Sequence, residues 1–117
     1  MANIVPDSFK QELFLATHNF STTSGNTFKL ALYTTVSGFS TGTTNYITTN
    51  EASGTGYSAG GTTLVNSTVT VAQNISFVSF SNATFSTATL TASCCLIYNS
   101  TQSNKAVVVL DFGGSKT

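Results

Sequence analysis

The chain reads CCLIYNSTQSNKAVVVLDFGG from Cys94 to Gly114, and this segment contains its strongest strand signals. The run from Thr84 to Tyr98, which leads into it, is rich in Thr, Leu, Ile, Phe and Cys and is typical of a strand. Ala106–Phe112 is almost continuously apolar, as expected of a central strand buried on both faces. The polar connection Asn99–Asn104 is about six residues long, so the sequence predicts an antiparallel hairpin here.

Shorter β patterns precede this hairpin. Phe28–Thr34 alternates so that Phe28, Leu30 and Leu32 share a face, which predicts a half-buried strand. A weakly patterned connection, residues 35–50, contains one expected short strand at Tyr46-Ile47, and a glycine-rich corner around Tyr57 follows. Further strands are expected at Thr62–Val65, Val69–Val71 and Ile75–Phe80. The count predicts a mostly β fold, an antiparallel β-sandwich or barrel of roughly six to eight strands with one short N-terminal helix.

That helix is expected from Phe9 to Ala16, where no β-branched residue occurs and Phe9, Leu13 and Ala16 recur at helical spacing. Ser8 followed by Gln11 three positions later is a candidate capping box. We therefore divide the chain into an N-terminal arm and helix, residues 1–20, packed on or extending from the domain, and a single β domain, residues 21–117. The charged residues of the first segment argue against a signal peptide or a membrane span.

Charge is scarce in this chain. Only 7% of the 117 residues are charged, the formal net charge is zero and Arg is absent. An average domain has about a quarter charged residues, so hydroxyls and amides must supply the solubility here. Without a basic patch, neither nucleic acid nor a membrane surface is an expected partner. A neutral surface also lacks self-repulsion, which favours a homo-oligomer.

Residues that could carry chemistry are few. His18 is the only histidine, no two of the four carboxylates are close in sequence, and no G-x-S-x-G motif occurs. We interpret His18 as a capping or surface residue at the end of the helix. The glycines between Ser53 and Gly61 lack the lysine of a phosphate-binding loop and are better explained as a sheet corner. We therefore expect no enzyme activity and no cofactor.

Cys94 and Cys95 are adjacent, and a disulfide between neighbours would close a strained ring that constrains little. Reduced thiols are expected, which is consistent with an intracellular origin. Their spacing does not suit a tetrahedral zinc site, so no metal is predicted. Because consecutive strand side chains point to opposite faces, we expect one of the two thiols in the core.

Several segments resemble a family of small, poorly characterised virion proteins of tailed bacteriophages. The resemblance spans both ends and the middle of the chain: Met1–Lys10, Asn50-Glu51, Ser53–Tyr57, Gly60-Gly61, Asn82–Phe85, Leu96–Ser100, Asn104–Val107 and Leu110–Gly114. It implies a structural, decoration-like protein located in the virion and assembled in the host cytoplasm. It implies no catalytic residue.

The leading functional hypothesis is a capsid decoration or cement protein that stabilises the shell by binding major capsid subunits or other virion proteins. A trimer would allow multivalent attachment. The candidate partner contacts are Phe9, Leu13, Phe14 and Tyr57. The alternative is a component of the tail or of a head fibre that binds a host surface carbohydrate. In that case the four tyrosines, Tyr33, Tyr46, Tyr57 and Tyr98, could offer stacking platforms.

Overall fold

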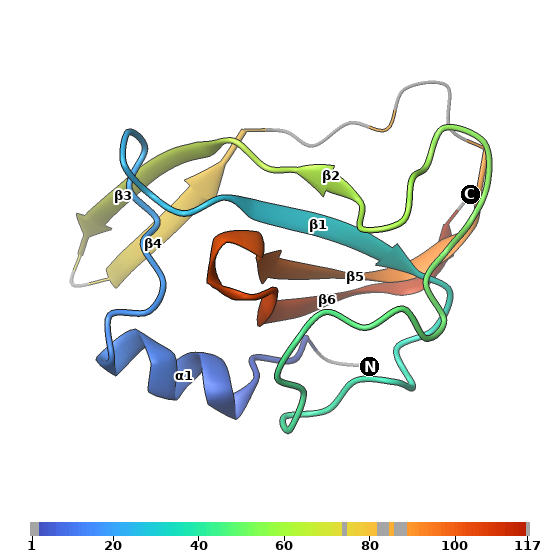
Figure 1. The fold of residues 1–117 in the computed structure, drawn as a ribbon, viewed down its shortest axis with the longest axis horizontal. Helices are drawn as coiled ribbons and strands as arrows, with labels where there is room; N and C mark the ends of the chain where they lie inside the picture. The colour runs from blue at the N-terminus through green and yellow to red at the C-terminus, as the bar shows by residue number, and fades with distance from the viewer. Residues whose placement is uncertain (1–2, 74, 82–84, 86–88, 117) are drawn as a thin grey trace.

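The computed structural model describes residues 3–73, 75–81, 85 and 89–116. Its elements are α1 (Asp7–Phe14), β1 (Phe28–Tyr33), β2 (Thr62–Thr63), β3 (Asn66–Ala72), β4 (Ile75–Phe80), β5 (Ala92–Asn99), the 3-10 turn η1 (Ser100–Gln102) and β6 (Lys105–Lys116). The strands form a four-stranded antiparallel sheet in the order β2-β1-β5-β6 and a separate β3-β4 ribbon (Figure 1). The predicted mostly β fold with one short N-terminal helix is confirmed. The described strands form no closed barrel, and the two sheets fit the sandwich arrangement better.

The predicted hairpin is confirmed as β5-η1-β6, with Leu96 opposite Val109 and Ile97 opposite Val108. The strand expected from Thr84 is shorter, since β5 begins at Ala92, and part of the missing stretch lies outside the described residues. The Asn99 side chain accepts hydrogen bonds from the backbone N–H groups of Thr101 and Gln102, at 3.1 and 3.3 Å. This side chain therefore closes the turn that joins the two longest strands.

The prediction that Ala106–Phe112 forms a central strand is wrong, because β6 lies at the edge of the sheet. Its apolar character has another cause, which is that other segments cover this edge. Ile4 and Val109 exchange backbone hydrogen bonds of 2.9 and 2.8 Å, and the Ala106 N–H donates to the Thr44 carbonyl at 2.9 Å. A covered edge cannot pair with another chain, and its side chains can be apolar on both faces.

Both faces of the four-stranded sheet carry a core. One core contains Ala31, Tyr33, Cys94, Leu96 and Val109 together with Phe39 from a loop. The other contains Phe28, Leu64, Ile97 and Val107, with Phe9, Phe20 and Phe80 packed against it. The prediction of a half-buried β1 is therefore wrong, because the connection after β1 covers its second face. The expected strand at Tyr46-Ile47 is also not formed. That segment packs against the first core as a loop.

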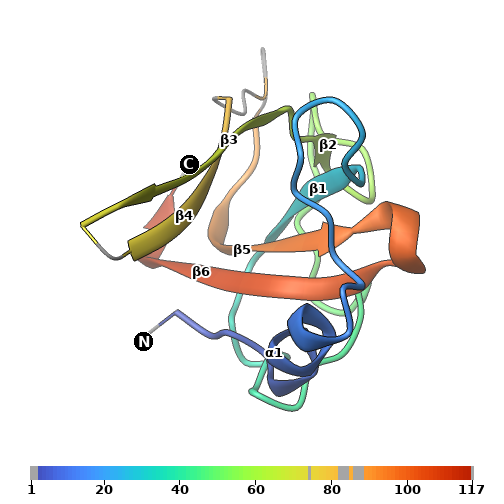
Figure 2. The same cartoon turned by 90° about the vertical axis from the view of Figure 1, so that its left-hand side faces the viewer.

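Helix α1 lies alongside β6 (Figure 2). It begins at Asp7 and has no side-chain cap, so the predicted capping box is wrong. Ser8 lies inside the helix, and its hydroxyl donates to the Thr43 carbonyl at 3.3 Å. Ala16 follows the helix with a φ of 57° and is not part of it. No helix in the described part of the chain is long and apolar enough to cross a membrane.

Candidate functional site

The C-terminal end of α1 presents apolar side chains to solvent. Leu13, Phe14 and Leu15 are 48%, 93% and 68% exposed. Two of the predicted partner contacts, Leu13 and Phe14, therefore lie on the surface. The third, Phe9, turns inward and packs 4.9 Å from the His18 ring, between ring centroids. We refer to Leu13, Phe14 and Leu15 as the helix-end patch.

An open apolar groove of about 440 Å³ lies beside this patch. Its lining comes from α1, the loop after it, the β3-β4 ribbon and β6: Phe9, Leu13, Phe20, Val69, Val78, Val107 and Val108. None of these residues is charged. The ribbon adds exposed valines, with Val69, Val71 and Val78 at 57%, 67% and 40% exposure. Sequence reasoning assigned no function to these valines, although their alternation along an uncharged strand was a readable signal.

Tyr57, the fourth predicted contact, belongs to a different site built around Glu51. The hydroxyls of Tyr46 and Tyr57 donate to the two Glu51 carboxylate oxygens, each at 2.6 Å, and the Gly60 N–H donates at 2.8 Å. Tyr57 also accepts a hydrogen bond from the Leu32 N–H of β1 at 3.0 Å. Burial, and next the hydrogen bond to Glu51, raise the pKa of both tyrosines above the usual range for that side chain. This arrangement keeps both phenols protonated and fixes the glycine-rich corner to the sheet.

The other two tyrosines are buried in the first core. The Tyr33 hydroxyl donates to the Ile47 carbonyl, and that of Tyr98 donates to the Gly60 carbonyl, both at 2.6 Å. The Tyr98 ring stacks on Tyr46 with 4.8 Å between centroids. Stacking platforms for a sugar need exposed aromatic faces, and Tyr33 and Tyr98 are 0% and 3% exposed. The tyrosines instead attach the loops after β1 to the sheet.

His18 lies in a buried polar cluster, so its expected capping or surface position is wrong. It is 8% exposed, its Nε2 lies 2.8 Å from Glu12 Oε1, and Asn99 Nδ2 lies 2.9 Å from its Nδ1. Since an amide nitrogen only donates, Nδ1 is the acceptor and Nε2 carries the proton. Lys105 Nζ reaches the second Glu12 oxygen at 3.4 Å.

This histidine–carboxylate pair differs from the one in a catalytic triad. There the carboxylate orients one ring nitrogen while the other takes a proton from a nucleophile. In this chain the second nitrogen already accepts from Asn99, which is fully buried. The cluster ties α1 and the segment after it to the β5-β6 hairpin.

The two cysteines are free thiols. Both are buried, whereas only one was expected in the core. Burial raises the pKa of Cys95 to about 11 and raises that of Cys94 as well. Thiols that stay protonated near neutral pH are poor nucleophiles and poor metal ligands. Within the described residues, no group of three His, Cys, Asp or Glu side chains could hold a metal ion.

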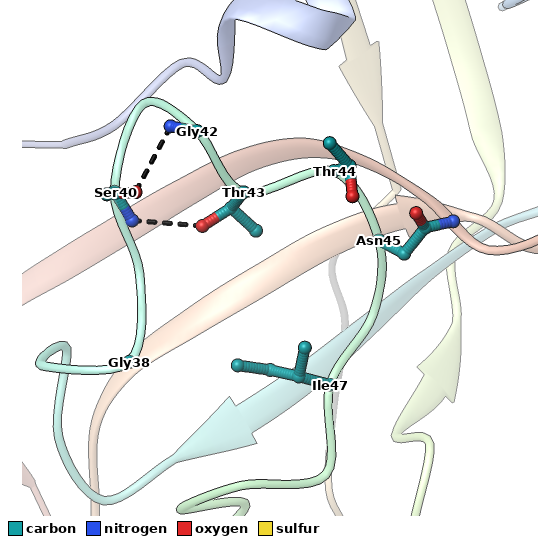
Figure 3. Close-up of a pocket in the computed structure, with 7 residues that line it drawn as sticks. All are labelled: Gly38, Ser40, Gly42, Thr43, Thr44, Asn45 and Ile47. Carbon is teal, nitrogen blue, oxygen red and sulfur yellow. Dashed lines mark hydrogen bonds between the residues drawn. The ribbon is translucent and has the colours of Figure 1, made fainter.

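A shallow polar pocket of about 350 Å³ lies in the connection after β1 (Figure 3). Its lining has no charged or aromatic side chain: Gly38, Ser40, Gly42, Thr43, Thr44, Asn45 and Ile47. The Ser40 hydroxyl accepts from the Gly42 N–H at 3.1 Å, and the Thr43 hydroxyl accepts from the Ser40 N–H at 2.9 Å. These hydroxyls stabilise the turns of their own loop.

Fold and sites together define a small antiparallel β protein in which polar networks fix the loops and apolar side chains are left on the outside. Comparison of the chain with family models, with curated proteins and with solved structures found no match. The resemblance to phage virion proteins therefore stays a prediction from the residues that carry it.

Proposed function

We propose that this chain is a noncatalytic structural component of a tailed-phage virion, a decoration or cement protein that binds major capsid subunits. The observation that carries the proposal is the helix-end patch, because it places a phenylalanine that is 93% exposed between two exposed leucines. A solvated apolar patch of this kind is typical of surfaces that contact a partner, which supports the proposal.

The free energy available from this patch is considerable for its size. Burying one large apolar side chain contributes about 1.5–3 kcal/mol. Phe14 and Leu15 are both more than two-thirds exposed, so docking would transfer most of their surface out of water. The exposed ion pair on α1, Asp7 with Lys10 at 2.9 Å, is internally neutral and adds no repulsion toward a partner.

When several linked copies attach to one shell, the binding free energies of these modest contacts add up. Two linked sites can exceed the affinity of either one by about 10²–10⁴ when both engage. A decoration protein can therefore rely on a small apolar patch, provided that it is presented in several copies. The low charge of the chain suits this role because close-packed neighbours would not repel one another.

The test uses particles of the encoding phage that lack this protein, mixed with purified chain and sedimented. We expect the wild-type chain to cosediment and Phe14→Ser to lose at least about tenfold in affinity, with an unchanged melting temperature because the side chain is exposed. Val65→Ser is the matched control, since Val65 is 62% exposed and lies outside α1. Cryo-microscopy that shows no added density on the capsid lattice, or equal binding by Phe14→Ser, would contradict the proposal.

A further inference from the structure

Among the described residues, no strand pairs with the outer edges of the β3-β4 ribbon. Within the described part of the chain, β3 and β4 pair only with each other. The ribbon forms one end of the long axis of the molecule (Figure 1). A two-stranded ribbon is marginally stable in water, and unpaired edges can pair with another strand. By contrast, the β6 edge of the larger sheet is covered by the segments of Ile4 and Thr44.

The ribbon lacks the usual protection of an edge. Proteins commonly place Lys, Pro or inward-pointing charges on exposed edge strands to prevent pairing between chains. Residues 65–81 contain no Asp, Glu, Lys, Arg or Pro. The single irregularity in the pairing lies at the beginning of β3, between Asn66 and Thr68, and leaves the rest of the strand regular.

The hairpin register shows which backbone groups of β3 face outward. Ala72 pairs with Ile75, so two residues connect the strands, and such a hairpin is closed by a hydrogen-bonded pair. Because hydrogen-bonded and non-hydrogen-bonded pairs alternate, the pairs at Val71 and Val69 are non-hydrogen-bonded. Their N–H and C=O groups therefore point to the outer edge of β3. Both side chains are more than half exposed.

We propose that the outer edge of β3 pairs antiparallel with β3 of a second copy across a two-fold axis, which joins two ribbons into one four-stranded sheet. The occupant is a second copy because an edge strand is self-complementary in this arrangement, and self-pairing places identical residues near one another. A charged edge would repel the same edge of a second copy, whereas this edge carries no charge over its whole length. The pairing would also place Val69 and Val71 beside apolar residues of the other copy on the same face of the joined sheet.

This proposal does not depend on a role in a virion. It concerns an edge of the ribbon, while the proposed function concerns the helix-end patch. It specifies a dimer, since a two-fold pairing through β3 uses this edge of both copies.

The experiment is a charge-exchange test at Val69. In one symmetric register, Val69 lies opposite Val69 of the second copy. In the other, it lies opposite Val71 and is therefore diagonal to Val69 of the second copy. Molar mass is measured by sedimentation equilibrium over a concentration series for wild type, Val69→Lys, Val69→Glu and an equimolar mixture. We expect wild type to reach twice the chain mass of 12.2 kDa. Each variant alone should dimerise at least about tenfold more weakly, because like charges meet across the pair, and the mixture should recover the dimer.

Two further measurements control this result. Thr48→Lys, at an exposed loop position, adds the same charge away from the ribbon and should leave dimerisation unchanged. In hydrogen exchange, the amides of Val69 and Val71 should gain protection as protein concentration rises. If the Val69 variants fail to fold by circular dichroism, the same exchange is made at Val71, which is 67% exposed.

A wild-type chain that stays monomeric at every concentration overturns the proposal, as does a trimer. Dimers that persist unchanged in both charged variants, or a mixture of two monomeric variants that does not recover a dimer, also overturn it. Loss of particle binding by Phe14→Ser leaves it untouched, so the two proposals fail separately.

Discussion

Removing the Glu51 carboxylate should destabilise the fold strongly, although this residue is only half-buried. Glu51 accepts three hydrogen bonds, from the Tyr46 and Tyr57 hydroxyls and from the Gly60 N–H. Glu51→Ala would leave all three donors without this acceptor, at a site where the tyrosine rings are partly buried.

The magnitude follows from the kind of hydrogen bond. Bonds to a charged acceptor contribute about 1.5–3 kcal/mol each, so three could contribute about 5–9 kcal/mol if none were replaced. Glu51 is only half-buried, and water can reach some of the donors after the side chain is removed. We therefore expect Glu51→Ala to lower the free energy of unfolding by about 2–4 kcal/mol, a large part of the total for a domain of this size.

The assay is urea unfolding followed by circular dichroism, with a double-mutant cycle. Tyr46→Phe removes one hydroxyl and should lose about 1 kcal/mol. Combined with Glu51→Ala it should lose less than the sum of the two single changes, because the hydroxyl has already lost its acceptor. Limited proteolysis between residues 53 and 61 should become faster in Glu51→Ala, since the corner is no longer fixed to β1.

Two results would refute this reasoning. A loss below about 0.5 kcal/mol would place Glu51 among ordinary surface positions. Strict additivity in the cycle would show that Glu51 and Tyr46 do not interact in solution, whatever their distance.

Three further changes test other parts of the fold. Gly61→Ala should lower the free energy of unfolding by about 3 kcal/mol or more, because an added Cβ would lie 1.8 Å from the Leu30 carbonyl oxygen. Gly113 has the same φ of 81° but open space around it, so Gly113→Ala should lower it by only about 1–2 kcal/mol in the same urea assay. Burial raises the pKa of Cys95 to about 11, so the stability that comes from the neutral thiol is complete below its ordinary pKa of 9.0 and is lost as pH rises through about 11. The buried tyrosines act in the same direction, and unfolding midpoints at rising pH should fall less in Cys95→Ala. Asn99→Asp removes both donors from a fully buried side chain, one of them to His18, and thermal unfolding should show a loss of about 3 kcal/mol.

The strand pattern was predictable because it depends on local alternation. Ile75–Phe80 was predicted with the bounds that β4 has, and the β5-β6 hairpin followed from two apolar runs and a polar turn. The position of β6 at the edge was not predictable. An edge covered by residues 60 and 105 positions away has the same apolar composition as a central strand, because neither leaves a strand edge open to water.

The polar clusters could not be read from the sequence for a related reason. His18 and Asn99 are 81 residues apart, and nothing near either one indicates the other. Glu51, Tyr57 and Gly60 are close in sequence, but they lie in loops, where no periodicity predicts which way a side chain turns. The glycine cluster was a correct signal of a corner, and it carried no information about the carboxylate within it.

The distribution of polar and apolar side chains links the two proposed surfaces. Of the four carboxylates, Glu12 and Glu51 are engaged in holding loops and helix to the sheet, and Asp7 is paired with Lys10. Asp7 and Lys10 are exposed but neutralise each other, and apolar side chains are exposed on α1 and on the ribbon. Leu13 and Val69 line the same groove, so both surfaces border one region of the molecule.

Under the two proposals, a dimer formed through β3 would present two helix-end patches in one rigid unit. The second contact with a shell would then form at a high effective concentration, which is how two weak patches can give stable attachment.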